Sequence, residues 1–202
     1  MIDFTMAIKR LEKKARWILL AFVIAASISV VNAALFVYYG VSITAQGQPP
    51  PVVFAPGKNA NGTDLRGTQI LVSFDSTNTS LTITVHPTYR THLYRNITLI
   101  VNQDSANAYY LAFNVTTAFT NTKITQAKLF IKTLAGAPIA TIDLKATGVQ
   151  GWPITLPANG KLRIDLFLVI TPGPSDGFNN PPFTSDSATL QLIYSPQNAE
   201  SP

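Results

Sequence analysis

The sequence predicts an all-β protein: a single β-sandwich or jelly-roll domain preceded by a signal peptide and an extended N-terminal strand. Three observations lead to this prediction. The 202-residue chain is 47% hydrophobic and only 12% charged, which is too apolar for a disordered chain and suits one domain with a sizeable core. From residue 52 onward, short apolar segments alternate with turn residues. Ahead of them, a basic segment is followed by an apolar one and then by small residues.

The first 33 residues have the layout of a secretory signal peptide. Basic residues between Lys9 and Arg16 precede an uncharged apolar segment of about 15 residues, and small residues follow at Ala33 and Ala34. The basic end would stay in the cytoplasm while the apolar segment enters the membrane. We therefore expect residues 1–33 to be removed by cleavage after Ala33, or one residue later.

Two other interpretations of this segment stay open. The uncharged run continues from residue 17 to about residue 46 and could be retained as a membrane anchor, because about 20 residues span a bilayer. Alternatively, a peptidase could cut at the basic end and leave the apolar helix as the core of a type IV pilin-like filament. The glycine expected at such a cleavage point is missing.

Residues 34–51 are predicted to form a strand and a spacer. Apolar residues occupy every second position, the period of a half-buried strand, and these are Val37, Tyr39, Val41 and Ile43. The Gln- and Pro-rich residues 46–51 favour a stiff, extended spacer. The mature chain would therefore begin with an apolar strand on a tether.

The body, residues 52–202, is predicted to hold eight or nine short strands in two sheets that bury their inner faces against each other. The clearest strand is 161–170, with Lys161, Arg163 and Asp165 on one face and Leu162, Ile164, Leu166 and Leu168 on the other. The apolar segments of strand length lie at 69–75, 80–85, 93–101, 108–116, 124–133, 138–144, 161–171 and 188–194. Segments 56–67 and 172–182, rich in Pro, Gly and Asn, are expected to be surface loops.

The net charge of +5 does not indicate a nucleic-acid-binding protein. Five basic and two acidic residues lie within residues 1–33, so the rest of the chain carries only +2. Its basic residues are interleaved with the strands and are expected to lie on solvated faces. The chain has no cysteine, which excludes disulfides and thiolate chemistry, so stability must come from packing.

Titratable residues are too sparse to predict an enzyme, a cofactor or a metal site. His86 and His92 flank a turn, but no carboxylate lies near them in sequence as a third metal ligand. Asp176 and Asp186 bracket a Pro-rich loop without the spacing of a calcium loop. Trp152 is expected to be a core or sheet-edge aromatic.

Four Asn-X-Ser/Thr triplets match the N-glycosylation pattern, at Asn61, Asn78, Asn96 and Asn114. Asn61 and Asn78 fall in or beside predicted turns and are the favoured acceptors. Asn96 and Asn114 lie within predicted strands and would need to face outward.

The tethered strand leads to a functional hypothesis. An apolar strand must fold back or pair elsewhere to satisfy its backbone groups, and pairing with an open edge on another copy is β-strand addition. Repeated head to tail, this pairing makes a filament. We therefore expect a homopolymer, with 34–46 as the donor strand.

In layout, a signal peptide, a mature start at Ala34 and a Thr- and Asn-rich β body resemble archaeal bundling pilins and the related TasA/camelysin biofilm-matrix fibre proteins. The resemblance implies a structural subunit of an extracellular pilus or matrix fibre, polymerising by donor-strand exchange and adhering to fibres on neighbouring cells. The long Pro spacer departs from that pattern. A membrane-anchored monomeric surface or glycan-binding protein is the remaining alternative.

Overall fold

The computed structural model describes residues 12–25, 39–172, 182–199 and 202. The predicted cleavage residues Ala33 and Ala34, the first donor-strand position Val37, and Asp176 lie outside the described residues. Residues 12–25 form a helix, and residues 39–50 form neither helix nor strand. Among the described residues, we find no helix with both the length and the hydrophobicity needed to cross a bilayer. The chain divides into two units, Met1–Gly47 and Gln48–Pro202.

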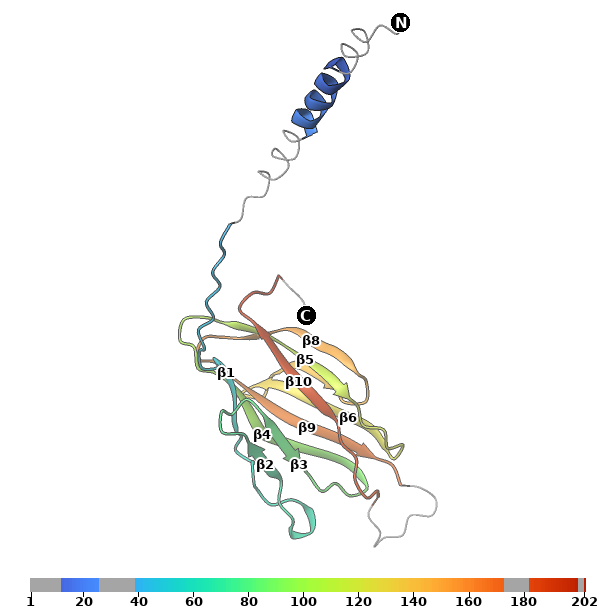
Figure 1. The fold of residues 1–202 in the computed structure, drawn as a ribbon. Coiled ribbons are helices and arrows are strands. Elements are labelled where there is room, and N and C mark those ends of the chain that lie inside the picture. The colour runs from blue at the N-terminus through green and yellow to red at the C-terminus, as the bar shows by residue number, and fades with distance from the viewer. Residues whose placement is uncertain (1–11, 26–38, 173–181, 200–201) are drawn as a thin grey trace, which may run out of the picture. The chain divides into compact units, whose positions relative to one another are not determined.

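The described residues of the second unit form ten strands, which confirms the all-β prediction (Figure 1). The strands are β1 (Val52–Pro56), β2 (Leu71–Phe74), β3 (Leu81–Thr84), β4 (Arg90–Asn102), β5 (Tyr109–Thr117), β6 (Ile124–Thr133), β7 (Pro138–Asp143), β8 (Gly148–Leu156), β9 (Lys161–Ile170) and β10 (Thr189–Ser195). One short 3-10 helix, η1 (Leu65–Gly67), precedes β2. All eight predicted strand segments are confirmed, while β1 and β8 are additional. In β8, Gly148, Gly151 and Pro153 obscure the apolar period.

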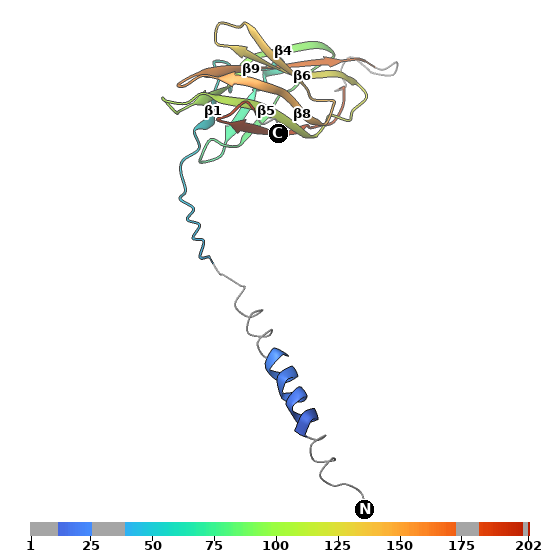
Figure 2. The ribbon, with the colours of Figure 1, turned by 90° about the horizontal axis from the view of Figure 1, so that it is seen from above.

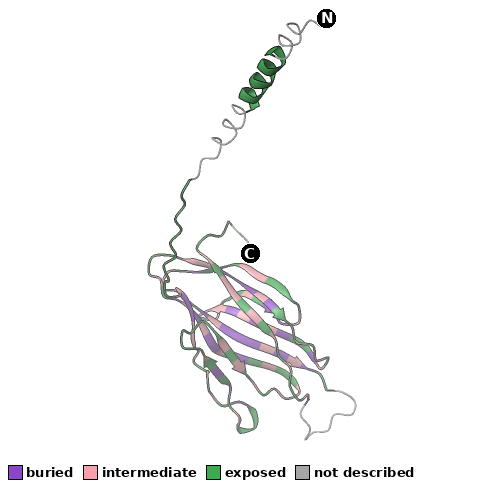
Figure 3. Ribbon diagram, viewed as in Figure 1, coloured by how far each residue is buried: buried purple, intermediate pink, exposed green. Residues whose placement is uncertain are grey.

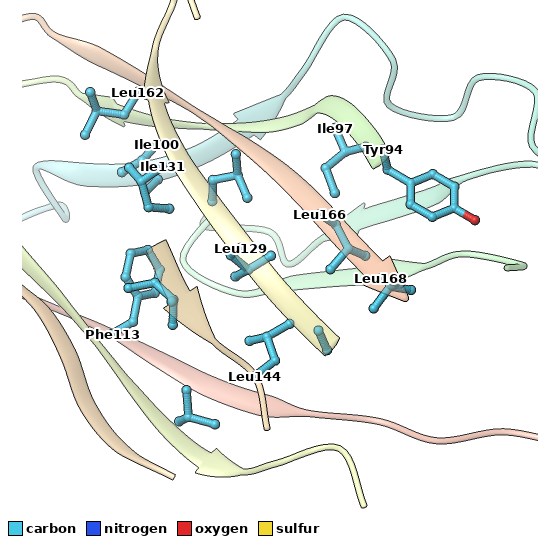
Figure 4. Packing of buried hydrophobic residues seen from close by; sticks show 14 of the residues in the cluster. Tyr94, Ile97, Ile100, Phe113, Leu129, Ile131, Leu144, Leu162, Leu166 and Leu168 are labelled. Carbon is cyan, nitrogen blue, oxygen red and sulfur yellow. The ribbon is translucent and has the colours of Figure 1, made fainter. Parts of the chain in front are cut away.

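The strands form three antiparallel sheets. The largest has the order β1-β4-β9-β6-β7, the second has the order β10-β5-β8, and β2 pairs only with β3. In Figure 2, β4, β9 and β6 lie in one layer and β5 and β8 lie in the other. A single core cluster joins the layers, since it includes Ile131 of β6, Phe113 of β5 and Val72 of β2 (Figure 4). Burying each large apolar side chain contributes about 1.5–3 kcal/mol, so this cluster holds the layers together.

The alternation predicted for 161–170 is confirmed, but its polar face is less solvated than expected. Asp165 has no exposed surface, and its neighbours Lys132 and Arg163 keep only 18% and 17% of their side chains exposed. Lys132 Nζ lies 2.9 Å from Asp165 Oδ2, and Arg163 donates to both carboxylate oxygens at 3.1 Å. Burial by itself raises the pKa of Asp165, but hydrogen bonds from Asn96 N and these two cations lower it below its ordinary value.

The backbone hydrogen bond from Asn96 N to Asp165 comes from a bulge in β4. The register of β4 against β9 shifts between Tyr94 and Thr98, and Asn96 adopts a positive φ of 51°. Its amide donates to Asp165 Oδ1 at 2.7 Å, while its carbonyl accepts from Asn59 N at 3.0 Å. The loop after β1 crosses so close to this bulge that a Cβ on Gly57 would overlap the Asn96 carbonyl.

Candidate functional site

The body has a groove of about 1060 Å³ that is bordered by two strands. One wall is residues 79–85, which include all of β3, and the other is residues 187–194, which include most of β10. These walls belong to different sheets, because β3 pairs with β2 and β10 pairs with β5. The groove therefore runs between two strands that share no hydrogen bonds with each other.

Each wall presents an unpaired strand edge. Within the described residues, β3 has β2 as its only partner strand and β10 has β5 as its only partner strand. A strand with one free edge carries backbone N–H and C=O groups that water or another strand must satisfy. The groove is thus flanked on both sides by backbone groups able to pair with one added strand.

The floor of the groove is apolar. It is formed by core residues of the five-stranded sheet, including Leu129 of β6 and Leu166 and Leu168 of β9. Leu129 lies directly opposite Leu166 in the register (Figure 4). Wall residues that face this floor are only partly buried, namely Leu81, Ile83, Leu190 and Leu192. The inner face of the body is therefore partly open to solvent along the groove.

Charge is nearly absent from the groove. Among the described residues that line it, Asp186 is the one with a charged side chain. Its Oδ2 accepts from the backbone amides of Thr120 at 2.9 Å and Asn121 at 2.7 Å, and its Oδ1 accepts from Ser187 N at 2.9 Å. Asp186 therefore ties the chain before β10 to the loop after β5, and the groove suits an apolar, uncharged occupant.

The β2–β3 hairpin, which forms one wall, is held to the rest of the body by side-chain hydrogen bonds. Asp64 accepts from Leu65 N and from His86 N, both at 2.7 Å, and Asn61 Oδ1 accepts from Val72 N at 2.9 Å. At the hairpin turn, Asp75 accepts from Thr77, Thr79 and Ser80. Its hydrogen bonds, first the one from the Thr77 hydroxyl, lower the pKa of Asp75 to about 2.

The two histidines have separate contacts. His86 Nδ1 lies 3.3 Å from Asp64 Oδ2, whereas His92 Nε2 lies 2.9 Å from the Thr88 carbonyl and its ring stacks on Tyr94 with centroids 6.2 Å apart. Burial, and after it the charge of Asp64, raise the pKa of Tyr94. No group of three potential metal-ligating side chains occurs among the described residues.

The four sequence-predicted glycosylation residues have different environments. Asn78 is exposed at the β2–β3 turn. Asn61 is also exposed, and its side-chain Oδ1 accepts a hydrogen bond from Val72 N. Asn96 lies in the β4 bulge with its side-chain oxygen buried and without a hydrogen-bond partner. Asn114 of β5 is half-buried, with Nδ2 3.4 Å from Gln191 Oε1. Asn78 is the acceptor that the surroundings obstruct least.

The described donor-strand residues are almost fully exposed. Tyr39, Val41 and Ile43 keep 85%, 81% and 91% of their surface accessible, and residues 39–49 are all exposed (Figure 3). Three large apolar side chains in water on one face of a short segment are unfavourable unless another surface covers them. Trp152, by contrast, lies in β8 at the edge of its sheet, which confirms a sheet-edge position.

Sequence reasoning identified the exposed segment but not the groove. The residues of both groove walls have the pattern of ordinary half-buried strands. Nothing in that local pattern indicates which strand edges remain unpaired. Comparison with known protein families gives no matching family model, and comparison with curated protein sequences gives no match. The function is therefore argued from the groove and the exposed segment alone.

Proposed function

We propose that the protein is a structural subunit of an extracellular pilus or matrix fibre, in which residues 37–44 of one copy occupy the groove of the next. The observation that carries the proposal is the groove between two unpaired strand edges, which is lined by apolar and neutral polar residues apart from Asp186. The chain also has a spare apolar segment of matching pattern, with Tyr39, Val41 and Ile43 exposed. Head-to-tail repetition would make a homopolymer that binds cells together.

The dimensions of the two parts agree. The β10 wall is eight consecutive residues, 187–194, and the alternating part of the donor strand, residues 37–44 within 34–46, is also eight residues, which is about 26 Å as a strand. Alternate side chains of an added strand point to one face, so Val37, Tyr39, Val41 and Ile43 would all face the apolar floor. Gly40 and the polar members would face outward. The donor segment has no charged residue, which matches the walls and floor.

The expected energetics make a durable joint. Four large side chains at about 1.5–3 kcal/mol each give a gross gain of about 6–12 kcal/mol. Ladder hydrogen bonds to both walls add about 0.5–1.5 kcal/mol each, against an association cost of about 4–15 kcal/mol. The prolines of the spacer, residues 49–51, lack N–H groups and end the ladder, so the tether itself would not pair.

The test uses matched variants of the donor segment. Val41→Asp places a carboxylate toward the floor, whereas Ser42→Asp places the same charge on the outward side. We expect the Val41 variant to fold but to form no filaments by electron microscopy, and the Ser42 variant to polymerise. Normal filaments from Val41→Asp, or equal loss in both variants, would contradict strand exchange.

A second measurement separates this proposal from the alternatives. The N-terminal sequence of protein sheared from cells should begin at Ala34 or Leu35 if the signal peptide is removed. A start near Trp17 would indicate a pilin-like filament with a retained helix, and an intact Met1 in membranes would indicate an anchored monomer.

A further inference from the structure

The sheet β10-β5-β8 differs from the rest of the body in its charge. None of its three strands contains Lys, Arg, His, Asp or Glu. The five-stranded sheet carries its charges on β4, β6, β7 and β9. The outer surface of β10-β5-β8, here called the uncharged face, is therefore suited to a neutral partner.

Two aromatic rings lie together on the uncharged face. Tyr110 and Trp152 have ring centroids 6.5 Å apart and planes tilted by 59°. Both are partly exposed, and neither packs against the core cluster. Trp152 lies where β8 is irregular: the register of β8 against β5 shifts between Leu111 and Phe113, and Gly151 has a positive φ of 82°. A Cβ on Gly151 would lie 2.8 Å from Ile142 Cδ1, so a side chain at position 151 would be crowded by the core.

Uncharged polar groups surround the aromatic pair. Tyr110 lies between Ser195 and Thr155 in the register, so a row of hydroxyl-bearing residues crosses all three strands. Further along β5, Asn114 lies opposite Gln191, with Nδ2 3.4 Å from Oε1. These amides and hydroxyls offer both donors and acceptors for hydrogen bonds.

We propose that the uncharged face binds a neutral polysaccharide. Sugar rings present apolar C–H surfaces that pack on aromatic rings and hydroxyls that pair with amides, and Tyr and Trp give rigid contact area with a polar end. A neutral polymer needs no charged side chain for binding, and strands β5, β8 and β10 contain none. Leu192 lines the groove and packs on the core cluster, whereas Tyr110, Asn114 and Trp152 are not among the groove-lining residues, so the sugar and an inserted donor strand would contact different residues.

This inference does not depend on strand exchange. The full-length chain, made in a host without N-glycosylation, is run in native gels containing dextran, mannan or a β-glucan, with dextran sulfate as the anionic comparison. We expect retardation by at least one neutral polymer, unchanged by 0.5 M salt. Trp152→Ala and Asn114→Ala should each weaken retardation at least fivefold while filaments stay normal, because neither residue lines the groove.

Phe130→Ala is the matched control. Phe130 also belongs to an aromatic pair, with its ring centroid 5.7 Å from that of Phe167, but this pair is on the other sheet and beside the charged Lys132. The Phe130 variant should bind neutral polymers as the wild-type protein does. No retardation by any neutral polymer, equal loss in the control, or preference for dextran sulfate that salt abolishes would each overturn the proposal. A fall in sedimentation coefficient for Trp152→Ala without a change in sugar binding would instead make this face a contact between copies.

Discussion

Leu192→Asp tests the acceptor side of the proposed joint. In an empty groove Leu192 is half-buried and reaches solvent, so the new carboxylate can stay hydrated and the isolated subunit should lose no more than about 1–2 kcal/mol. In an occupied groove the same carboxylate would be enclosed by apolar side chains. Because an Asp with a pKa near 3.9 must be protonated to be buried unpaired, the cost at pH 7 is about 4 kcal/mol.

Adding about 1 kcal/mol of lost apolar burial gives about 5 kcal/mol per joint, which is a factor of about 10³–10⁴ in the association constant. Urea unfolding measures the subunit, and sedimentation with electron microscopy measures the filament. Asn114→Asp puts the same charge on the neighbouring strand β5, at a residue that does not line the groove, and should polymerise. The Leu192 variant should partly recover near pH 4, where the carboxylate is protonated at less cost. A folded Leu192→Asp subunit that polymerises like wild type at pH 7 would refute the reasoning.

Three further predictions concern the body. The pKa of Asp165 is lowered in the fold, so the contribution of this carboxylate to stability is present above the unfolded pKa near 3.9 and is lost as pH falls through the folded pKa. Asp165→Asn should therefore lower the free energy of unfolding in urea by about 2–3 kcal/mol at pH 7 and by less in acid. An equal loss at the two pH values would argue against this charge network. Gly57→Ala should destabilise the fold by about 1–3 kcal/mol because the added Cβ would overlap the Asn96 carbonyl. Gly40→Ala should be neutral, because no atom lies within 4 Å of the added Cβ. Equal melting temperatures for the two variants would contradict this prediction. If the native protein is glycosylated, glycopeptide mass spectrometry should find Asn78 occupied and Asn96 empty, and the reverse pattern would contradict the assignment from burial.

The strands were predictable because their signals are local. The alternation of Leu162, Ile164 and Leu166 with polar residues fixes which face of β9 is buried, and Asn159 adopts the positive φ that the turn before β9 needs. Strand β8 was not predictable in this way. Its glycine and proline residues interrupt the period, and only pairing with β5 holds it as a strand.

Sequence alone determined the all-β class, eight of the ten described strands and the alternating apolar pattern of residues 37–44, because side-chain period and turn chemistry act over a few residues. The tertiary structure decided which strand edges stay unpaired. Strands β3 and β10 lie about a hundred residues apart in the chain, and the groove between them exists because each pairs on one side only. It also decided that Asp165 is buried, since the amide that satisfies it comes from a bulge 69 residues away. Such long-range pairings leave no local pattern, so they appear only once the chain has folded.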